Sequence, residues 1–110
     1  MQVQFVEEGK RLIARPQGRM EAADGTDLAS AVQQRLRAGA SSLTIDLDEV
    51  EFINFGAIRA VLRLARSLAG KTDLGFVGGN RLVRDALDQA GLDDFFPFMP
   101  PYVSTRGVPR

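Results

Sequence analysis

Short strand-like segments alternate with segments of helical period along this chain, and that order constrains the fold more than any other feature. The strand-like runs cover residues 3–6, 11–15, 42–47 and 74–78. Apolar residues recur three and four positions apart at about 26–38, 54–69 and 80–90. Each of these helical segments has one apolar stripe, and the three stripes need a common apolar face to be buried on. The order β-β-α-β-α-β-α therefore predicts an α/β fold in which helices cover a mixed sheet.

The first two strand-like runs form a predicted β-hairpin, because Glu8-Gly9-Lys10 between them has the composition of a tight turn. Pro16 lacks an amide donor, so we expect the second strand to be irregular or at a sheet edge at that point. Residues 42–47 are assigned to a central strand whose alternating apolar side chains face one side of the sheet. These side chains are Leu43, Ile45 and Leu47.

Polar residues mark the starts of the three predicted helices. Asp24 or Thr26 can cap the first helix, Asn54 the second and Asn80 the third. Helix ends are indicated by Gly39, Gly70 and Gly91. The expected buried stripe of the second helix consists of Ile58, Val61, Leu62, Ala65 and Leu68. The expected buried stripe of the third helix consists of Leu82, Val83, Ala86, Leu87 and Ala90.

The length of the chain limits its domain organisation. A chain of 110 residues is long enough for one compact domain and too short for two. We expect a single domain over residues 1–98, in which the aromatic run Phe95 to Phe98 packs across the domain edge. The prolines and polar residues that follow predict a loosely ordered C-terminal tail over residues 99–110.

The composition excludes several classes of function. The chain has no His and no Cys, so it lacks thiol nucleophiles, disulfides, the usual zinc ligands and the commonest general base. Fourteen basic and fourteen acidic residues give a net charge of zero, so we expect no direct binding to nucleic acid. The sequence has neither a secretion signal nor an apolar run of membrane-spanning length, which predicts a cytoplasmic protein without membrane insertion.

An acidic stretch follows the predicted central strand. It consists of Asp46, Asp48, Glu49 and Glu51. Carboxylates of this kind can hold Mg²⁺ or Ca²⁺, but the stretch lacks the alternating ligands and central Gly of a calcium loop. We interpret it as a solvated acidic loop, after which Phe52-Ile53 return to the core, and we expect no metal site.

The glycines near the third helix raise the possibility of a nucleotide site. The sequence GFVGGN at residues 75–80 matches neither the dinucleotide-binding pattern nor the P-loop pattern, so Gly78-Gly79 favour a tight strand-to-helix turn. No serine motif of a hydrolase or β-lactamase is present either. We therefore expect no cofactor and no enzymatic activity.

Three separate motifs resemble one known family. The stretch LTIDLDEVEFINFGAIRAVLRLARSLAG, from Leu43 to Gly70, is similar to the core of STAS domains, the family of anti-sigma factor antagonists. Gly18 to Ala22 is similar to the family's entry into its first helix, and Gly91 to Phe96 resembles its Gly-Leu-x-x-x-Phe ending. The resemblance covers about residues 3 to 97 and implies a STAS fold with a mixed sheet of four or five strands.

The resemblance also implies a function in protein binding. Well-known family members capture an anti-sigma factor kinase and so release a sigma factor, and phosphorylation of a Ser at the start of the second helix prevents that capture. The family motif Asp-Ser-Ser-Gly falls on Asn54, Phe55, Gly56 and Ala57 of this chain. Because Phe55 has no hydroxyl group, no phosphorylation is expected at this position. A phosphorylation site at another hydroxyl, such as Ser67 or Thr44, stays open.

Two interpretations of Phe55 stay open from the sequence. If Phe55 is exposed beside Arg59 and Arg63, the surface has the composition of an interface hot spot. Alternatively, Phe55 is buried in the core and the arginines are the solvated face of an amphipathic helix. On the first interpretation the partner-binding residues are Asn54, Phe55, Gly56, Ala57, Arg59 and Arg63.

Two functions from different classes follow from the resemblance. In the first, the chain is a non-enzymatic regulator that docks on an anti-sigma factor or kinase-like protein and is constitutively competent to bind. In the second, it is a STAS subunit of a transport-associated complex that handles lipids or anions. A homodimer formed through the Phe55 surface is a third possibility.

Overall fold

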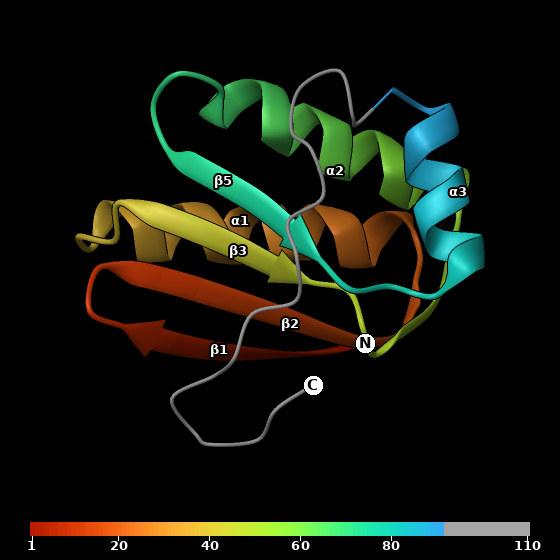
Figure 1. Ribbon diagram of the computed structural model, residues 1–110, viewed down its shortest axis with the longest axis horizontal. Coiled ribbons are helices and arrows are strands. Elements are labelled where there is room, and N and C mark those ends of the chain that lie inside the picture. Colours follow the sequence, from red (N-terminus) through yellow and green to blue (C-terminus); the bar gives the residue numbers. More distant parts are fainter. Residues whose placement is uncertain (92–110) are drawn as a thin grey trace.

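The computed structural model describes residues 1–91 and has the predicted α/β architecture, with helices packed on a mixed five-stranded sheet (Figure 1). The strands are β1 (Gln2–Glu8), β2 (Arg11–Met20), β3 (Ser42–Asp46), β4 (Val50–Ile53) and β5 (Asp73–Val77). The helices are α1 (Ala22–Arg37), α2 (Phe55–Leu68) and α3 (Arg81–Gln89). The expectations for Phe95 to Phe98 and for the tail 99–110 lie outside the described residues.

The sheet has the order β1-β2-β3-β5, and β4 pairs separately with the end of β2. β1 and β2 form the predicted antiparallel hairpin, and the other pairings are parallel. β2 changes its parallel partner along its length: residues 11–14 pair with β3 and residues 18–20 pair with β4. Pro16 lies in the interval between these two pairings and is buried. The expected irregular position at Pro16 is therefore confirmed, because β2 has no parallel partner at this point although the strand as a whole is central in the sheet.

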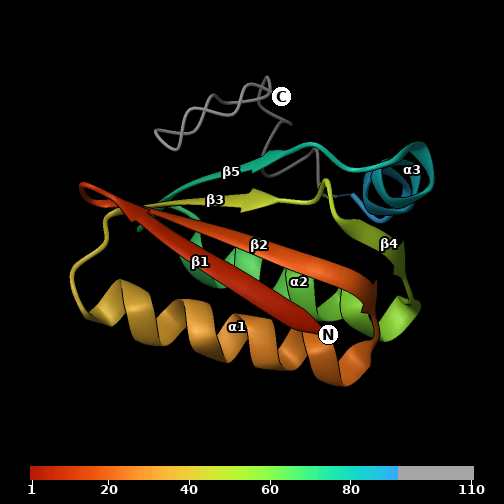
Figure 2. The same ribbon diagram turned by 90° about the horizontal axis from the view of Figure 1, so that it is seen from below.

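Both long helices cover the same face of the sheet, and α3 lies at the end of the sheet beside β4 (Figure 2). The core between the helices and the sheet includes Leu12, Leu28, Ile45, Val61 and Phe76. α1 and α2 pack closely where their side chains are smallest. A Cβ atom at Gly25 would lie 2.9 Å from the Cβ of Ala60, and one at Gly56 would overlap Ala22. Small residues at this crossing therefore set the distance between the two helices.

Two element boundaries differ from the sequence prediction. α1 begins at Ala22 with Glu21 as its N-cap, so the predicted start at Asp24 or Thr26 is wrong. Asp24 lies in the first turn instead, where its Oδ2 accepts a hydrogen bond from the Glu21 amide at 2.9 Å. β4 was expected to be part of a loop, and it becomes a strand because its backbone pairs with Gly18–Met20 of β2.

The third helix buries less than its sequence pattern indicates. Val83 and Leu87 are fully buried, whereas Leu82 is 62% exposed and Ala90 is also exposed. The prediction that Leu82 and Ala90 face inward is wrong, because this nine-residue helix packs at the end of the sheet mainly against β4. Only a narrow stripe of a helix is covered in that position.

Candidate partner-binding site

The start of α2 is fixed by hydrogen bonds of Asn54, as the sequence predicts. The Asn54 side-chain oxygen accepts a hydrogen bond from the Ala57 backbone amide at 2.9 Å. The backbone amide of Asn54 donates a hydrogen bond to the Met20 carbonyl at 3.1 Å. The Asn54 carbonyl also accepts from the Ile58 amide at 2.9 Å. These bonds connect the end of β2, the end of β4 and the first turn of α2, so the residue after Asn54 has a defined position.

That residue is Phe55, and its side chain is 84% exposed. Large apolar side chains that are exposed within residues 1–91 are Met1, Phe55 and Leu82, and Phe55 is the most exposed of them. Of the two interpretations that the sequence leaves open, the structure therefore favours the exposed ring. An exposed aromatic ring on a rigid helix start has a low conformational entropy and a large contact area, which suits an interface residue.

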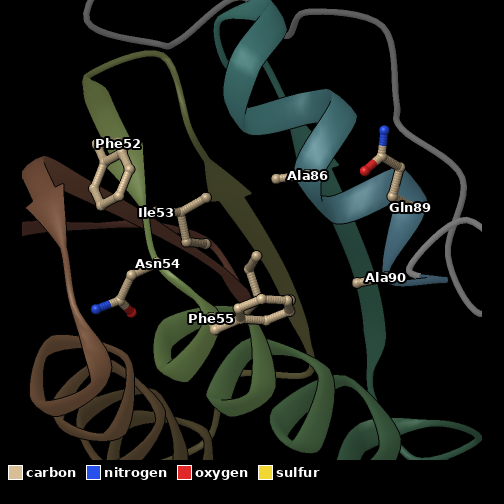
Figure 3. A pocket seen from close by; sticks show the side chains of 8 residues that line it. Phe52, Ile53, Asn54, Phe55, Ala86, Gln89 and Ala90 are labelled. Atoms are coloured by element: carbon tan, nitrogen blue, oxygen red, sulfur yellow. The ribbon is translucent and has the colours of Figure 1, made fainter.

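Phe55 borders a cleft between α2 and α3 with a volume of about 570 Å³ (Figure 3). This α2–α3 cleft is lined by Phe52, Ile53, Asn54, Phe55, Ile58, Ala86, Gln89 and Ala90. In Figure 3 the Phe55 ring projects from the first turn of α2 toward the α3 side of the cleft. None of the lining side chains is ionisable or nucleophilic. Such a lining can accept apolar side chains and lacks the groups that acid–base or nucleophilic catalysis needs.

Asn80 holds α3 beside β4 and so fixes the position of the second wall of the cleft. Its side-chain oxygen accepts a hydrogen bond from the Val83 amide at 2.8 Å, which is the predicted helix cap. Its side-chain nitrogen lies 3.3 Å from the carbonyl oxygens of both Val50 and Glu51. The sequence indicates the cap, but the link to β4 depends on a contact about thirty residues away in the chain.

Two of the six predicted partner-binding residues serve the packing of the fold and are not available to a partner. Ala57 is fully buried, and Gly56 packs against Ala22 of α1. A side chain at position 56 would overlap Ala22, so this glycine serves the contact between the helices. We therefore leave Gly56 and Ala57 out of the surface that a partner can contact.

Three arginines extend the exposed face of α2 beyond Phe55. Arg59, Arg63 and Arg66 are exposed, and α2 contains no acidic residue. Arg63 also borders a shallow groove between α1 and α2, together with Ser67 and residues of α1. Phe55, Arg59 and Arg63 thus share one exposed helix face, while Asn54 fixes the start of that helix.

The cleft also contains an aromatic residue that the sequence prediction assigned only to the core. Phe52 of β4 lines the cleft and is half-buried, and the Arg19 guanidinium carbon lies 4.4 Å from the centre of its ring. Phe52 and Arg19 are register partners on β4 and β2, so their proximity follows from the strand pairing that the sequence did not reveal.

Only Asp46 of the acidic stretch is buried, whereas its other three carboxylates are exposed, as expected for a solvated loop. Asp46 is 0% exposed, and its Oδ2 lies 3.1 Å from Nε of Arg15, which is 2% exposed. Asp46 Oδ1 accepts a hydrogen bond from the Asp48 amide, and Asp48 Oδ1 accepts one from the Gly79 amide, both at 3.0 Å. The solvated-loop interpretation is therefore wrong for Asp46, because Arg15 lies next to it on the neighbouring strand. Within residues 1–91 no group of three potential ligands is placed to hold a metal ion.

The hydroxyls considered as alternative phosphorylation sites differ in access. Thr44 lies in β3 and is buried, whereas Ser67 lies in the last turn of α2 and is exposed. The Ser67 hydroxyl donates a hydrogen bond to the Leu64 carbonyl at 2.8 Å. Access therefore argues against Thr44 and leaves Ser67 open.

The fold is similar to the folds of solved anti-sigma factor antagonists. An anti-sigma factor antagonist from Mycobacterium paratuberculosis has a TM-score of 0.79 at 21% identity, with 91% of this chain and 86% of that chain covered. A putative anti-sigma factor antagonist from Thermotoga maritima has a TM-score of 0.79 at 16% identity, with 94% and 90% covered. The phosphorylated form of the Bacillus cell fate determinant SpoIIAA has a TM-score of 0.70 at 12% identity, with 92% of both chains covered.

The family itself is identified from the sequence match. The chain belongs to the STAS family, because the family model described as "Mlab, STAS domain" matches residues 3–101. No curated protein matches this chain. The resemblance in the motifs at the start of α2 and around it is thus confirmed at the level of family and fold.

No helix within residues 1–91 is both long and apolar enough to cross a membrane.

Proposed function

We propose that this chain is a non-enzymatic regulator that docks on an anti-sigma factor or a kinase-like protein through the exposed start of α2. The observation that carries the proposal is the 84% exposure of Phe55, at the position where the family motif has its phosphorylatable Ser. Exposed aromatic residues beside an apolar cleft are typical of residues that dominate binding energy. Leu82 lies one turn before Ala86 on α3 and adds a second exposed apolar side chain near the cleft.

The absence of a hydroxyl at position 55 gives this regulator a constant binding state. In the family, a phosphate at this position prevents capture of the partner. Phe55 cannot accept a phosphate, so kinase activity at this position cannot release the partner. Control of binding would then depend on the amount of the protein or on another site, such as the exposed Ser67.

The chemistry of the cleft supports a docking role over a catalytic one. Its eight lining residues provide no general acid, general base or nucleophile. The whole chain also has no His and no Cys. A cleft of this kind gains binding energy by removing apolar surface from water, at roughly 25 cal/mol per Å².

The test is an affinity purification from the source cells with the full-length chain as bait, followed by affinity measurements on the recovered partner. Wild type should recover an anti-sigma factor or kinase-like protein, and Phe55→Ala should weaken its binding about 30-fold, which corresponds to a hot spot of about 2 kcal/mol. Phe55→Asp should weaken it further by placing a charge in an apolar contact. Lys10→Ala at the tip of the β1–β2 hairpin is the control and should bind like wild type.

Two results contradict this proposal. If Phe55→Asp binds the recovered anti-sigma factor as tightly as wild type, the start of α2 is not the docking site. If wild type recovers no such protein, the regulatory function itself is refuted.

A second candidate function is a subunit of a transport-associated complex. It rests on the match to the family model described as "Mlab, STAS domain", because STAS domains also accompany lipid- and anion-transport complexes. The same purification tests it, because transporter components would then replace the anti-sigma factor among the recovered proteins. Neighbouring genes give an independent check, since a kinase-type anti-sigma factor and a phosphatase favour the first function and transporter genes favour the second.

A further inference from the structure

The exposed face of α2 combines an aromatic ring with a row of positive charges. Phe55, Arg59, Arg63 and Arg66 are exposed and recur at three- and four-residue intervals, so they lie along one side of the helix. At a rise of 1.5 Å per residue, this row extends about 16 Å from the edge of the α2–α3 cleft. We call these four residues the α2 stripe.

The positive charge of the stripe is not balanced by acidic residues on the same helix. α2 contains no Asp or Glu, and no ion pair found within residues 1–91 involves Arg59 or Arg63. On the neighbouring helix, Asp85 is directed to Arg81, with 3.7 Å between its Oδ2 and Nε of that residue. The net charge of the whole chain is zero, so the stripe is a local feature of this surface.

From this arrangement we infer that the docking surface takes an acidic amphipathic segment of a partner protein. The inference rests on the proposed function and specifies the chemistry of its partner. Apolar side chains of the segment enter the α2–α3 cleft and contact the Phe55 ring. Its carboxylates lie along the stripe and pair with Arg59 and Arg63, whose guanidinium groups can each bind a carboxylate with two hydrogen bonds.

Two other occupants fit the surface less well. Nucleic acid or an anionic membrane would contact the arginines, but three cations on a neutral chain provide a weak electrostatic attraction. A second copy docked symmetrically through this surface would place arginines opposite arginines, and like charges in an interface are destabilising. An acidic protein segment satisfies the cleft and the charges together.

The test starts from a display library of random 18-residue peptides, which is selected against the immobilised full-length chain at 150 mM NaCl. Enriched peptides are synthesised, and their Kd is measured by fluorescence anisotropy. We expect the enriched peptides to carry two or more acidic residues between apolar residues at three- and four-residue spacing. Their Kd should rise at least tenfold in Arg59→Glu/Arg63→Glu and should also rise with salt concentration.

A matched control separates the local stripe from the total charge. Lys10→Glu/Lys71→Glu changes the net charge by the same amount, at the hairpin tip and in the segment after α2, and should change the Kd less than twofold. Circular dichroism and thermal unfolding of each double variant check that the fold is intact. Enriched peptides that are basic or uncharged, or an equal effect of both double variants, would overturn the inference.

The outcomes also separate this inference from the proposed function. Peptides that lose binding in Phe55→Ala but are indifferent to the arginines refute the acidic partner and leave the docking site standing. Peptides indifferent to Phe55 as well refute both. A concentration-dependent mass that Phe55→Ala abolishes identifies a second copy as the occupant and overturns the inference.

The sequence that follows α3 defines one more outcome. Residues 92–98 contain Asp93, Asp94 and three phenylalanines, so this segment of the chain has the same chemistry as the inferred partner. If selection on wild type enriches no peptide and the same selection on Phe95→Ala/Phe96→Ala does, the chain's own segment is the occupant and the inference is overturned. If neither selection enriches a peptide, the inference is overturned as well.

Discussion

The buried ion pair between Arg15 and Asp46 gives a prediction whose magnitude follows from the structure. Both side chains are at most 2% exposed, and Arg15 Nε lies 3.1 Å from Asp46 Oδ2. Asp46→Leu leaves the Arg15 guanidinium buried without that carboxylate. Removing one partner of a buried pair typically costs about 3–5 kcal/mol, and a small domain has a total free energy of unfolding of about 5–15 kcal/mol. We therefore expect this single substitution to remove about a fifth or more of the stability.

The double substitution Arg15→Met/Asp46→Leu should be much less harmful than either single one. Apolar side chains of similar volume need no desolvation of charge, and such replacements are often close to neutral. The hydrogen bond from the Asp48 amide to Asp46 is still lost, at a cost of about 1 kcal/mol. The double variant should lie within about 2 kcal/mol of wild type, and the sum of the single effects should exceed the double effect by about 3 kcal/mol or more.

Urea unfolding at 25 °C, followed by far-UV circular dichroism, measures these free energies by linear extrapolation. The exposed pair Arg81 and Asp85 offers a matched control with the same substitutions, Arg81→Met and Asp85→Leu. Each control substitution should change the free energy of unfolding by less than about 0.5 kcal/mol. If Arg15→Met/Asp46→Leu is as unstable as Asp46→Leu, the loss comes from packing, and the reasoning from buried charge is refuted.

Three further predictions test the elements around the cleft by the same urea unfolding. Asn54→Asp keeps the helix cap and should change the free energy of unfolding by less than about 0.5 kcal/mol. Asn80→Asp loses the hydrogen bonds to β4 and should lower that free energy by about 1–2 kcal/mol, and equal effects of the two substitutions would contradict the proposed link between α3 and β4. Gly56→Ala should lower the free energy of unfolding by about 1–3 kcal/mol, because the added Cβ overlaps Ala22. Adding Ala22→Gly should recover part of this loss, and a neutral Gly56→Ala would refute the close contact between the helices. Phe55→Ala should stay within about 0.5 kcal/mol of wild type, since the ring is 84% exposed, and a loss above about 2 kcal/mol would show that the ring is needed by the fold.

The parts of the fold that depend on local sequence could be predicted from it. The hairpin turn at Gly9, the caps at Asn54 and Asn80 and the strand-to-helix turn at Gly78-Gly79 all occur as expected. Each of these features depends on residues within a few positions of each other. The start of α1 was missed because its N-cap is Glu21, which is an unusual residue at that position.

The missed features depend on contacts between distant residues. Val50 to Ile53 contains one apolar–acidic alternation and is too short to identify as a strand without its partner, Gly18 to Met20. Asp46 looks like the first member of an acidic loop, and only the parallel pairing of β2 and β3 brings Arg15 beside it, 31 residues away. Burial of a charge therefore could not be inferred from the local composition.

The location of the candidate site could be predicted from the sequence, but the residues that line its cleft could not. The family motif located the start of α2, and the amphipathic pattern of α2 indicated which arginines are exposed. The second wall of the cleft comes from α3, which the sequence pattern oriented incorrectly at Leu82 and Ala90. The direction of the Phe55 ring depends on whether the core has room for it, and the core is already filled by other side chains.

The neighbours of Phe55 make position 55 a site of easy evolutionary change. Asn54 caps the helix, Gly56 contacts Ala22 and Ala57 is buried, so substitutions that remove the cap or add bulk at positions 56 and 57 disturb the fold. The side chain at position 55 has no comparable role in capping or packing, because it points away from the core. On the proposed function, one codon change from phenylalanine to serine would therefore replace an apolar contact residue by one that a kinase can phosphorylate. On that proposal, regulation at this helix start could change without compensating mutations in the core.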